Sequence, residues 1–221
     1  KASSINYLAT VRQPTCCAPG MINGSENPRL HGHHHAVQFY GNDASLFTTV
    51  GGFLSEGLVG GHPSIVIATG AHASAIADQL TSRLIDVEAA KASGDLVLLD
   101  AEETLATFMD DGIPNPGKFE HHVGGLIRDT LGGRTTMTVR AYGEMVDVLW
   151  KQGQEDAAIR LEILWNKLAT TYEFALLCGY SMGNFYKQAE RFQDVCRQHT
   201  HVLNSDPNVV VFEQQKRARI A

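Results

Sequence analysis

Short apolar runs bounded by turn residues are the feature of this chain that most constrains its fold. Residues 64–69, 95–100 and 174–180 each hold an almost unbroken series of aliphatic side chains. A strand of this kind is buried on both faces, which is typical of a parallel sheet covered by helices. Residues 36–40 and 136–140 are shorter stretches with strand character. The sequence therefore predicts a sheet whose central strands have no solvent-exposed face.

Amphipathic segments lie between these strands. Apolar residues recur at helical spacing in the following segments: 45–58, 73–84, 102–109, 119–131, 145–150, 156–170 and 190–201. Because strand and helix alternate, we expect an α/β fold with a mostly parallel central sheet flanked by helices on both faces. We assign residues 1–34 to an N-terminal extension, residues 35–203 to one α/β domain and residues 204–221 to a C-terminal tail or linker.

Composition narrows the classes of partner and compartment. The net charge of −6 and the lack of a basic stripe argue against direct nucleic-acid binding. No apolar run reaches the length of a membrane span, and the N-terminus has no signal-peptide core, so we expect a cytoplasmic protein without membrane contact. Four cysteines in 221 residues do not make a disulfide framework. Cys16 and Cys17 fall in the extension, whose role the sequence does not explain.

Nucleotide-binding motifs are absent. Neither GxxxxGK[ST] nor GxGxxG occurs, so we expect no ATP hydrolysis by a phosphate-binding loop. The turn after residues 36–40 offers one glycine and an acid instead. No nucleophile and base have a usable spacing either, and an enzyme is therefore the least favoured class.

Polar and aromatic side chains gather where the predicted strands end. In open α/β sheets, ligands bind at the carboxyl edge, so these residues predict a pocket for a small, largely apolar molecule. Arg140 and Glu144 need a partner, which could be a ligand or each other in a structural ion pair. Each aromatic, taken alone, more often belongs to ordinary core packing, because aromatic side chains dominate protein cores. The candidate ligand-binding residues are His35, Gln38, Tyr40, Thr69, His72, Arg140, Tyr142, Glu144, Trp165, Cys178 and Tyr180.

Ten histidines suggest a second kind of site. No pair has the spacing of a standard zinc motif, so a metal site would need distant segments to fold together. The alternative is surface histidines and an inert core cysteine. The candidate metal ligands are His35, Cys178, Cys196, His199 and His201.

Several blocks of the sequence resemble the MEDS domain, the methanogen/methylotroph sensory domain of dichloromethane-responsive regulators and many sensor kinases. The blocks lie at residues 35–40, 53–58, 65–72, 98–105, 140–145, 161–166, 176–180 and 195–201. The resemblance implies a RecA/KaiC-like core that has lost its phosphate-binding loop. It also implies the sensing of simple hydrocarbon derivatives in signal transduction.

The preferred hypothesis is therefore a non-enzymatic sensory domain. It would bind a small molecule and act on an output domain or a partner such as a histidine kinase or transcription regulator. Two alternatives are a metal- or haem-dependent sensor and a degenerate nucleotide-binding interaction domain. A homodimer is compatible with all three, and the sequence does not identify the ligand or any cofactor.

Overall fold

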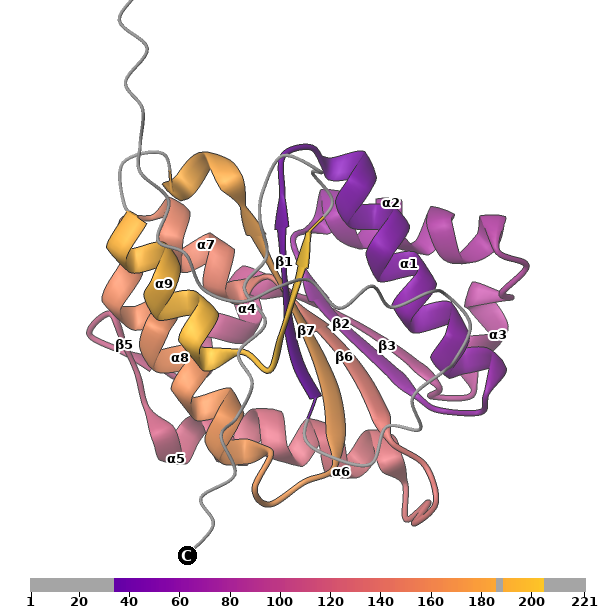
Figure 1. The fold of residues 1–221 in the computed structure, drawn as a ribbon. Coiled ribbons are helices and arrows are strands. Elements are labelled where there is room, and N and C mark those ends of the chain that lie inside the picture. The colour runs from indigo at the N-terminus through magenta and orange to yellow at the C-terminus, as the bar shows by residue number, and fades with distance from the viewer. Residues whose placement is uncertain (1–33, 186–188, 205–221) are drawn as a thin grey trace, which may run out of the picture.

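The computed structural model describes residues 34–185 and 189–204, and its centre is a six-stranded sheet in which every neighbouring pair is parallel (Figure 1). The strand order is β3-β2-β6-β7-β1-β8. The strands are β1 (His34–Tyr40), β2 (Ser64–Ala68), β3 (Leu96–Asp100), β6 (Val139–Gly143), β7 (Phe174–Ser181) and β8 (His201–Asn204). Consecutive strands β1 and β2 are separated by β6 and β7, so the chain crosses the sheet after α1.

Helices cover both faces of this sheet (Figure 1). One face carries α1 (Asp43–Val59), α2 (Gly70–Ser82) and α3 (Val87–Ala92). The other face carries α4 (Ala101–Ala106), α5 (Pro116–Phe119), a π-helical turn (Glu120–Gly124), α6 (Gly125–Leu131), α7 (Met145–Lys151), α8 (Glu155–Leu168) and α9 (Ala189–Gln198). The predicted fold class, a mostly parallel sheet with helices on both faces, is confirmed.

Side-chain alternation along the strands sorts the core into two halves. In β7, Leu176, Cys178 and Tyr180 face the α8 side, whereas Leu177 faces the α1 side. In β1, Phe39 faces α8 and Tyr40 faces α1. Because successive residues of a strand point to opposite faces, the polar residues of each strand are divided in the same way.

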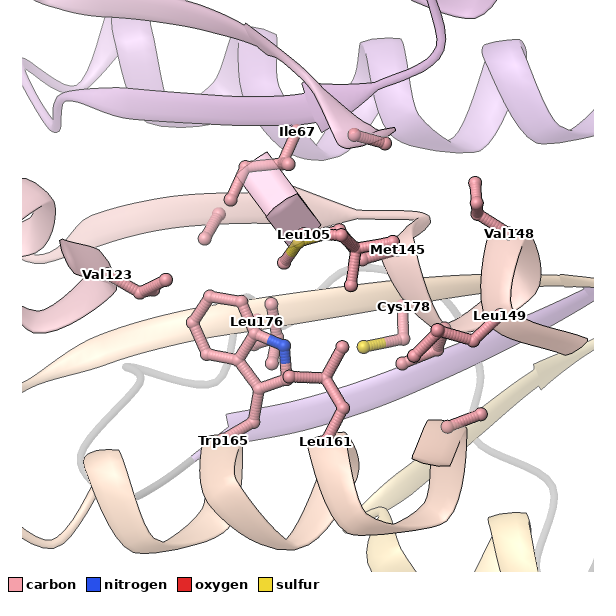
Figure 2. Close-up of a cluster of buried hydrophobic side chains, with 14 of the residues drawn as sticks. Ile67, Leu105, Val123, Met145, Val148, Leu149, Leu161, Trp165, Leu176 and Cys178 are labelled. Atoms are coloured by element: carbon pink, nitrogen blue, oxygen red, sulfur yellow. The ribbon is translucent and has the colours of Figure 1, made fainter. Parts of the chain in front are cut away.

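Helix α8 shows how the larger core half is packed. Leu161, Trp165 and Leu168 form its buried stripe. The Trp165 ring meets Phe119 edge-on at a centroid distance of 5.2 Å. Figure 2 shows Trp165 and Leu161 pointing from α8 into the cluster that also holds Leu176 and Cys178. The predicted ligand-binding residue Trp165 is therefore surrounded by core side chains in this structure.

Three local differences from the sequence analysis stand out. Residues 109–114, expected as part of a helix end and a loop, include a small antiparallel pair, β4 (Met109–Asp110) and β5 (Ile113–Pro114). Helix α3 was not expected. Strand β8 was not expected either, and it pairs with β1 at the edge of the sheet.

The ends of the chain leave part of the domain assignment open. The predicted extension (residues 1–34) and tail (residues 204–221) lie outside the described residues except for His34 and Asn204, so Cys16 and Cys17 are not described. Within the described residues, no helix is long and apolar enough to cross a membrane.

The two faces of α8 give a paired test of this packing. We expect Leu161→Ala to lower the free energy of unfolding by about 2–5 kcal/mol, because it removes a fully buried side chain from the core. Ile163 lies two residues away and is half exposed, so Ile163→Ala is the control and should change stability by less than about 0.5 kcal/mol. Urea unfolding followed by circular dichroism measures both, and equal losses would contradict the assigned faces.

Candidate functional site

Polar side chains join the carboxyl ends of the four interior strands in two pairs. Tyr40 ends β1, Thr69 follows β2, Glu144 follows β6, and Ser181 ends β7. Glu144 links the ends of β2 and β6, and Asp147 of α7 links the ends of β1 and β7. We call the following residues the carboxyl-edge network: Tyr40, Thr69, His72, Tyr142, Glu144 and Asp147.

Glu144 is the centre of one half of the network. Its carboxylate accepts hydrogen bonds from the backbone N–H of Thr69 at 2.5 Å, from Nδ1 of His72 at 2.6 Å and from the hydroxyl of Tyr142 at 3.1 Å. The residue is only 2% exposed. Thr69 is the N-cap of α2, so the carboxylate also lies at the positive end of that helix.

These contacts fix the charge state of the pair. Burial alone would raise the pKa of Glu144, but the hydrogen bonds from His72 and Thr69 outweigh burial and lower it. The hydrogen bond to Glu144 raises the pKa of His72 despite its partial burial. The favoured form is therefore a carboxylate paired with an imidazolium. Burial, together with Glu144, raises the pKa of Tyr142 well above its usual value, so its hydroxyl stays a donor.

Asp147 is the centre of the other half, and the sequence analysis did not select it. Its carboxylate accepts hydrogen bonds from the Tyr40 hydroxyl at 3.1 Å and the Ser181 N–H at 2.9 Å. It also accepts one from the Asn184 amide at 2.7 Å and pairs with Lys151 at 2.7 Å. Asn184 belongs to η2 (Met182–Phe185), a short 3-10 helix that leads toward α9. The sequence did carry a signal for Asp147, because it is the one acid in a first helical turn whose other residues are apolar.

A glycine of β7 lets Tyr142 reach its place. A Cβ on Gly179 would lie 2.9 Å from the Tyr142 hydroxyl and 3.3 Å from Leu46. The absence of a side chain at this position is therefore required for Tyr142 to lie across the neighbouring strand toward Glu144.

Arg140 and Gln38 lie apart from this network. Arg140 is the second residue of β6, and its guanidinium donates to the Phe53 carbonyl of α1 at 2.6 Å and pairs with Glu56 at 3.3 Å. The expectation that Arg140 sits at the carboxyl end of its strand is wrong, because the strand runs from Val139 to Gly143, and Arg140 pairs with Glu56 and not with Glu144. Gln38 donates to the Ser45 carbonyl in the first turn of α1 at 3.4 Å.

A second polar group lies between the sheet and α8. His35 of β1 has Nε2 at 3.1 Å from Glu162 Oε2 and 3.4 Å from Cys178 Sγ. Glu162 also accepts hydrogen bonds from the Tyr180 hydroxyl at 3.0 Å and from Cys178 at 3.6 Å. His199 follows α9 and has Nε2 at 3.4 Å from Glu162 Oε1. We call His35, Glu162, Cys178 and His199 the His–Glu–Cys cluster.

Burial and the neighbouring charged groups together set the pKa values in this cluster. Burial alone would raise the pKa of Glu162, but His199 and His35 outweigh it and lower that pKa strongly. Burial, and then His199, lower the pKa of His35. Burial and the nearby Glu162 raise the pKa of Cys178 well above its usual value, so the free thiol is not an activated nucleophile.

The cluster contains three of the five candidate metal ligands and one residue that the sequence analysis missed. Cys196 is half-buried and packs at the edge of the core, where burial raises its pKa to about 11. His201 is exposed, and its ring stacks on His34 at 5.3 Å. Neither lies in the cluster. Glu162 was detectable as an acid on the buried side of α8, between Ala158 and Trp165.

The comparison with family models gives one match. The model described as MEthanogen/methylotroph, DcmR Sensory domain matches residues 34–200. The chain belongs to the MEDS family. No curated protein matches this MEDS chain. The match begins one residue before His35 and ends one residue after His199, so it includes both polar groups. MEDS is a sensory domain family, which agrees with the resemblance seen in the sequence.

The His72–Glu144 pair should make stability depend on pH. The folded-state pKa of His72 lies above its ordinary value of 6.5, so the stabilisation is complete below about pH 6.5 and declines as the pH rises through the raised value. We therefore expect His72→Gln to lower the unfolding midpoint more at about pH 6 than at about pH 9.

Urea unfolding of wild type and variant at both pH values measures this effect. His122→Gln is the control, because His122 is exposed, and it should shift the midpoint little at either pH. A loss in His72→Gln that is the same at both pH values would contradict an ion pair with Glu144.

Proposed function

We propose that this MEDS domain is a non-enzymatic sensory module that binds a small molecule at the carboxyl-edge network. The observation that carries the proposal is that two buried carboxylates, Glu144 and Asp147, collect donors from the ends of all four interior strands. The carboxyl edge is where open α/β sheets bind ligands. Buried charges of this kind add little stability over apolar residues, which favours a functional reason for their presence.

The surroundings of the network suggest the kind of ligand. Phe47 lies edge-on to the His72 ring at 5.0 Å, and Leu46 lies beside Gly179 in the same apolar cluster as Tyr142. A molecule with a small apolar body and one hydrogen-bonding group would match apolar walls with a few placed polar atoms. A simple hydrocarbon derivative, the class that the family resemblance implies, meets this description.

Asp147 would connect ligand binding to a conformational change elsewhere in the chain. Its carboxylate accepts hydrogen bonds from the Ser181 N–H, at the end of β7, and from the Asn184 side chain in η2. A ligand that takes a partner from Asp147 would favour a second arrangement of residues 181–185 and hence of α9, the last helix described. An output domain or a cytoplasmic partner, such as a histidine kinase or transcription regulator, would respond to that change.

The test uses conservative variants and a defined set of probes. Dichloromethane, methanol and methylamine are each titrated into the protein, and the shift of the melting temperature gives the affinity. We expect at least one probe to stabilise the wild type. Tyr142→Phe and Glu144→Gln should weaken its binding about 10-fold or more, because the first removes a hydroxyl and the second a negative charge from the proposed site.

The matched control is Tyr180→Phe, the same substitution on the neighbouring strand, where the hydroxyl donates to Glu162 instead. It should bind the probe like wild type. Unchanged binding in folded Tyr142→Phe and Glu144→Gln proteins would overturn the assigned site. ATP belongs in the same set: an ATP-induced shift without hydrolysis, and no response to the other probes, would favour a degenerate nucleotide-binding domain.

A further inference from the structure

The His–Glu–Cys cluster has the geometry of a ligand set for one ion. One atom from each of its four residues lies within 4.8 Å of every other: an imidazole nitrogen of His35 and of His199, Sγ of Cys178 and an oxygen of Glu162. All four residues are buried. Tetrahedral zinc sites have Zn–N, Zn–O and Zn–S bonds that put neighbouring ligand atoms about 3.3–3.6 Å apart. His35 Nε2, Cys178 Sγ and Glu162 Oε2 lie 3.1, 3.4 and 3.6 Å from one another, and His199 Nε2 lies 3.4 Å from the other Glu162 oxygen, Oε1.

The imidazole rings of His35 and His199 are each oriented by a hydrogen bond at Nδ1, the nitrogen that points away from the cluster. The Asn166 amide donates to the Gln198 carbonyl at 2.9 Å, which turns its oxygen to His35 Nδ1 at 3.0 Å. His199 Nδ1 lies 2.7 Å from the Val195 carbonyl and donates to it. These two contacts favour the tautomers with Nδ1–H, in which both Nε2 lone pairs face the cluster. Metal-binding histidines are oriented in the same way, by a carbonyl or carboxylate on the second nitrogen.

When both imidazoles are neutral and no cation is present, the centre of the cluster has more acceptors than donors. In these tautomers, the Nε2 lone pairs of His35 and His199 face the oxygens of Glu162. The His199 contact does not have hydrogen-bond geometry, so within the described residues this buried Nε2 has no hydrogen-bond partner. An orphaned buried nitrogen is costly, and a positive ion between these acceptors would remove the cost.

We propose that His35, Glu162, Cys178 and His199 bind Zn²⁺ or a similar borderline divalent cation. The set combines two imidazoles with one sulfur and one carboxylate, which suits zinc and disfavours the oxygen-seeking Mg²⁺ and Ca²⁺. The thiol releases its proton to solvent when it binds, since the thiolate is the ligand. One thiolate and one carboxylate then balance the charge of the ion, so the buried site is neutral. The four atoms lie too close together to surround haem.

The ion would join segments that are distant in the sequence. Its ligands come from β1, β7, α8 and the residue that follows α9. His199 lies directly before Thr200, whose N–H donates to the His35 carbonyl at 2.7 Å, and before β8. Metal binding would therefore fix α9 and β8 against the core. The site shares no residue with the carboxyl-edge network.

The test begins with the 221-residue chain, which is stripped of metal by a chelator and titrated with Co²⁺ and then with Zn²⁺. We expect one Co²⁺ per chain, a sulfur-to-cobalt charge-transfer absorption, and loss of this absorption when Zn²⁺ takes the site. Zn²⁺ should also raise the melting temperature. The absence of stoichiometric binding of either ion to folded protein would overturn the proposal.

Cysteine variants then locate the sulfur ligand. The chain has four cysteines, so Cys16→Ser, Cys17→Ser and Cys196→Ser combined leave only Cys178. This triple variant should keep the absorption, and Cys178→Ser should lose it and bind Co²⁺ at least about 100-fold more weakly. Absorption that persists in Cys178→Ser, or disappears in a folded triple variant, would overturn the assignment. The triple variant decides the question even if Cys178→Ser does not fold.

Histidine variants give a second, matched comparison. His199→Gln should weaken Co²⁺ binding at least about 100-fold, whereas His201→Gln, two residues away and exposed, should bind like wild type. Equal losses in both would contradict the proposed ligand set. Tyr142→Phe should also bind Co²⁺ normally, so failure of the small-molecule proposal leaves this result unaffected, and the reverse holds too.

Discussion

The alternation of side chains along strands that are buried on both faces determines the arrangement of everything else in this domain. Because every other residue of β1 and β7 faces α8, His35, Cys178 and Tyr180 meet on one side of the sheet. Tyr40 and Tyr142 face the α1 side and reach the carboxyl edge. The two polar groups are separate because a sheet residue cannot serve both faces.

Three buried acids then determine which hydrogen bonds these polar residues make. Glu144, Asp147 and Glu162 are each at most 2% exposed, and each has several donors or cations around it. An isolated buried carboxylate would be very unfavourable, so each of the three requires its partners to keep their places. The partners come from different strands and helices, and the acids therefore act as connectors between elements. A perturbation at any of them reaches several elements at once.

Most of the fold could be predicted from local patterns. The five strands found at residues 34–40, 64–68, 96–100, 139–143 and 174–181 were all expected, because continuous apolar runs are a strong signal. Strand β8 was missed, because it has only four residues, with polar residues at both ends, and it forms by pairing with β1. The start of β6 was placed three residues too early, and this error moved Arg140 to the wrong end of the strand.

The candidate sites were harder to predict, because their contacts join residues far apart in the sequence. Glu144 meets His72 across 72 positions, and His35 meets Cys178 across 143. Which residues point into a site could be read from strand alternation, but which helix lies opposite could not. Glu162 and Asp147 were overlooked for this reason: acids on helices are usually solvated, and only the neighbouring elements show that these two are not.

Strand β8 also has a practical consequence for anyone who wishes to isolate this domain. The family match ends at residue 200, immediately before β8 begins at His201. A fragment cut at that boundary would lose the only described neighbour of β1 on that side and leave the backbone of β1 as an open sheet edge. Open edges of this kind pair with other chains and promote aggregation. A well-behaved fragment should extend at least through Asn204.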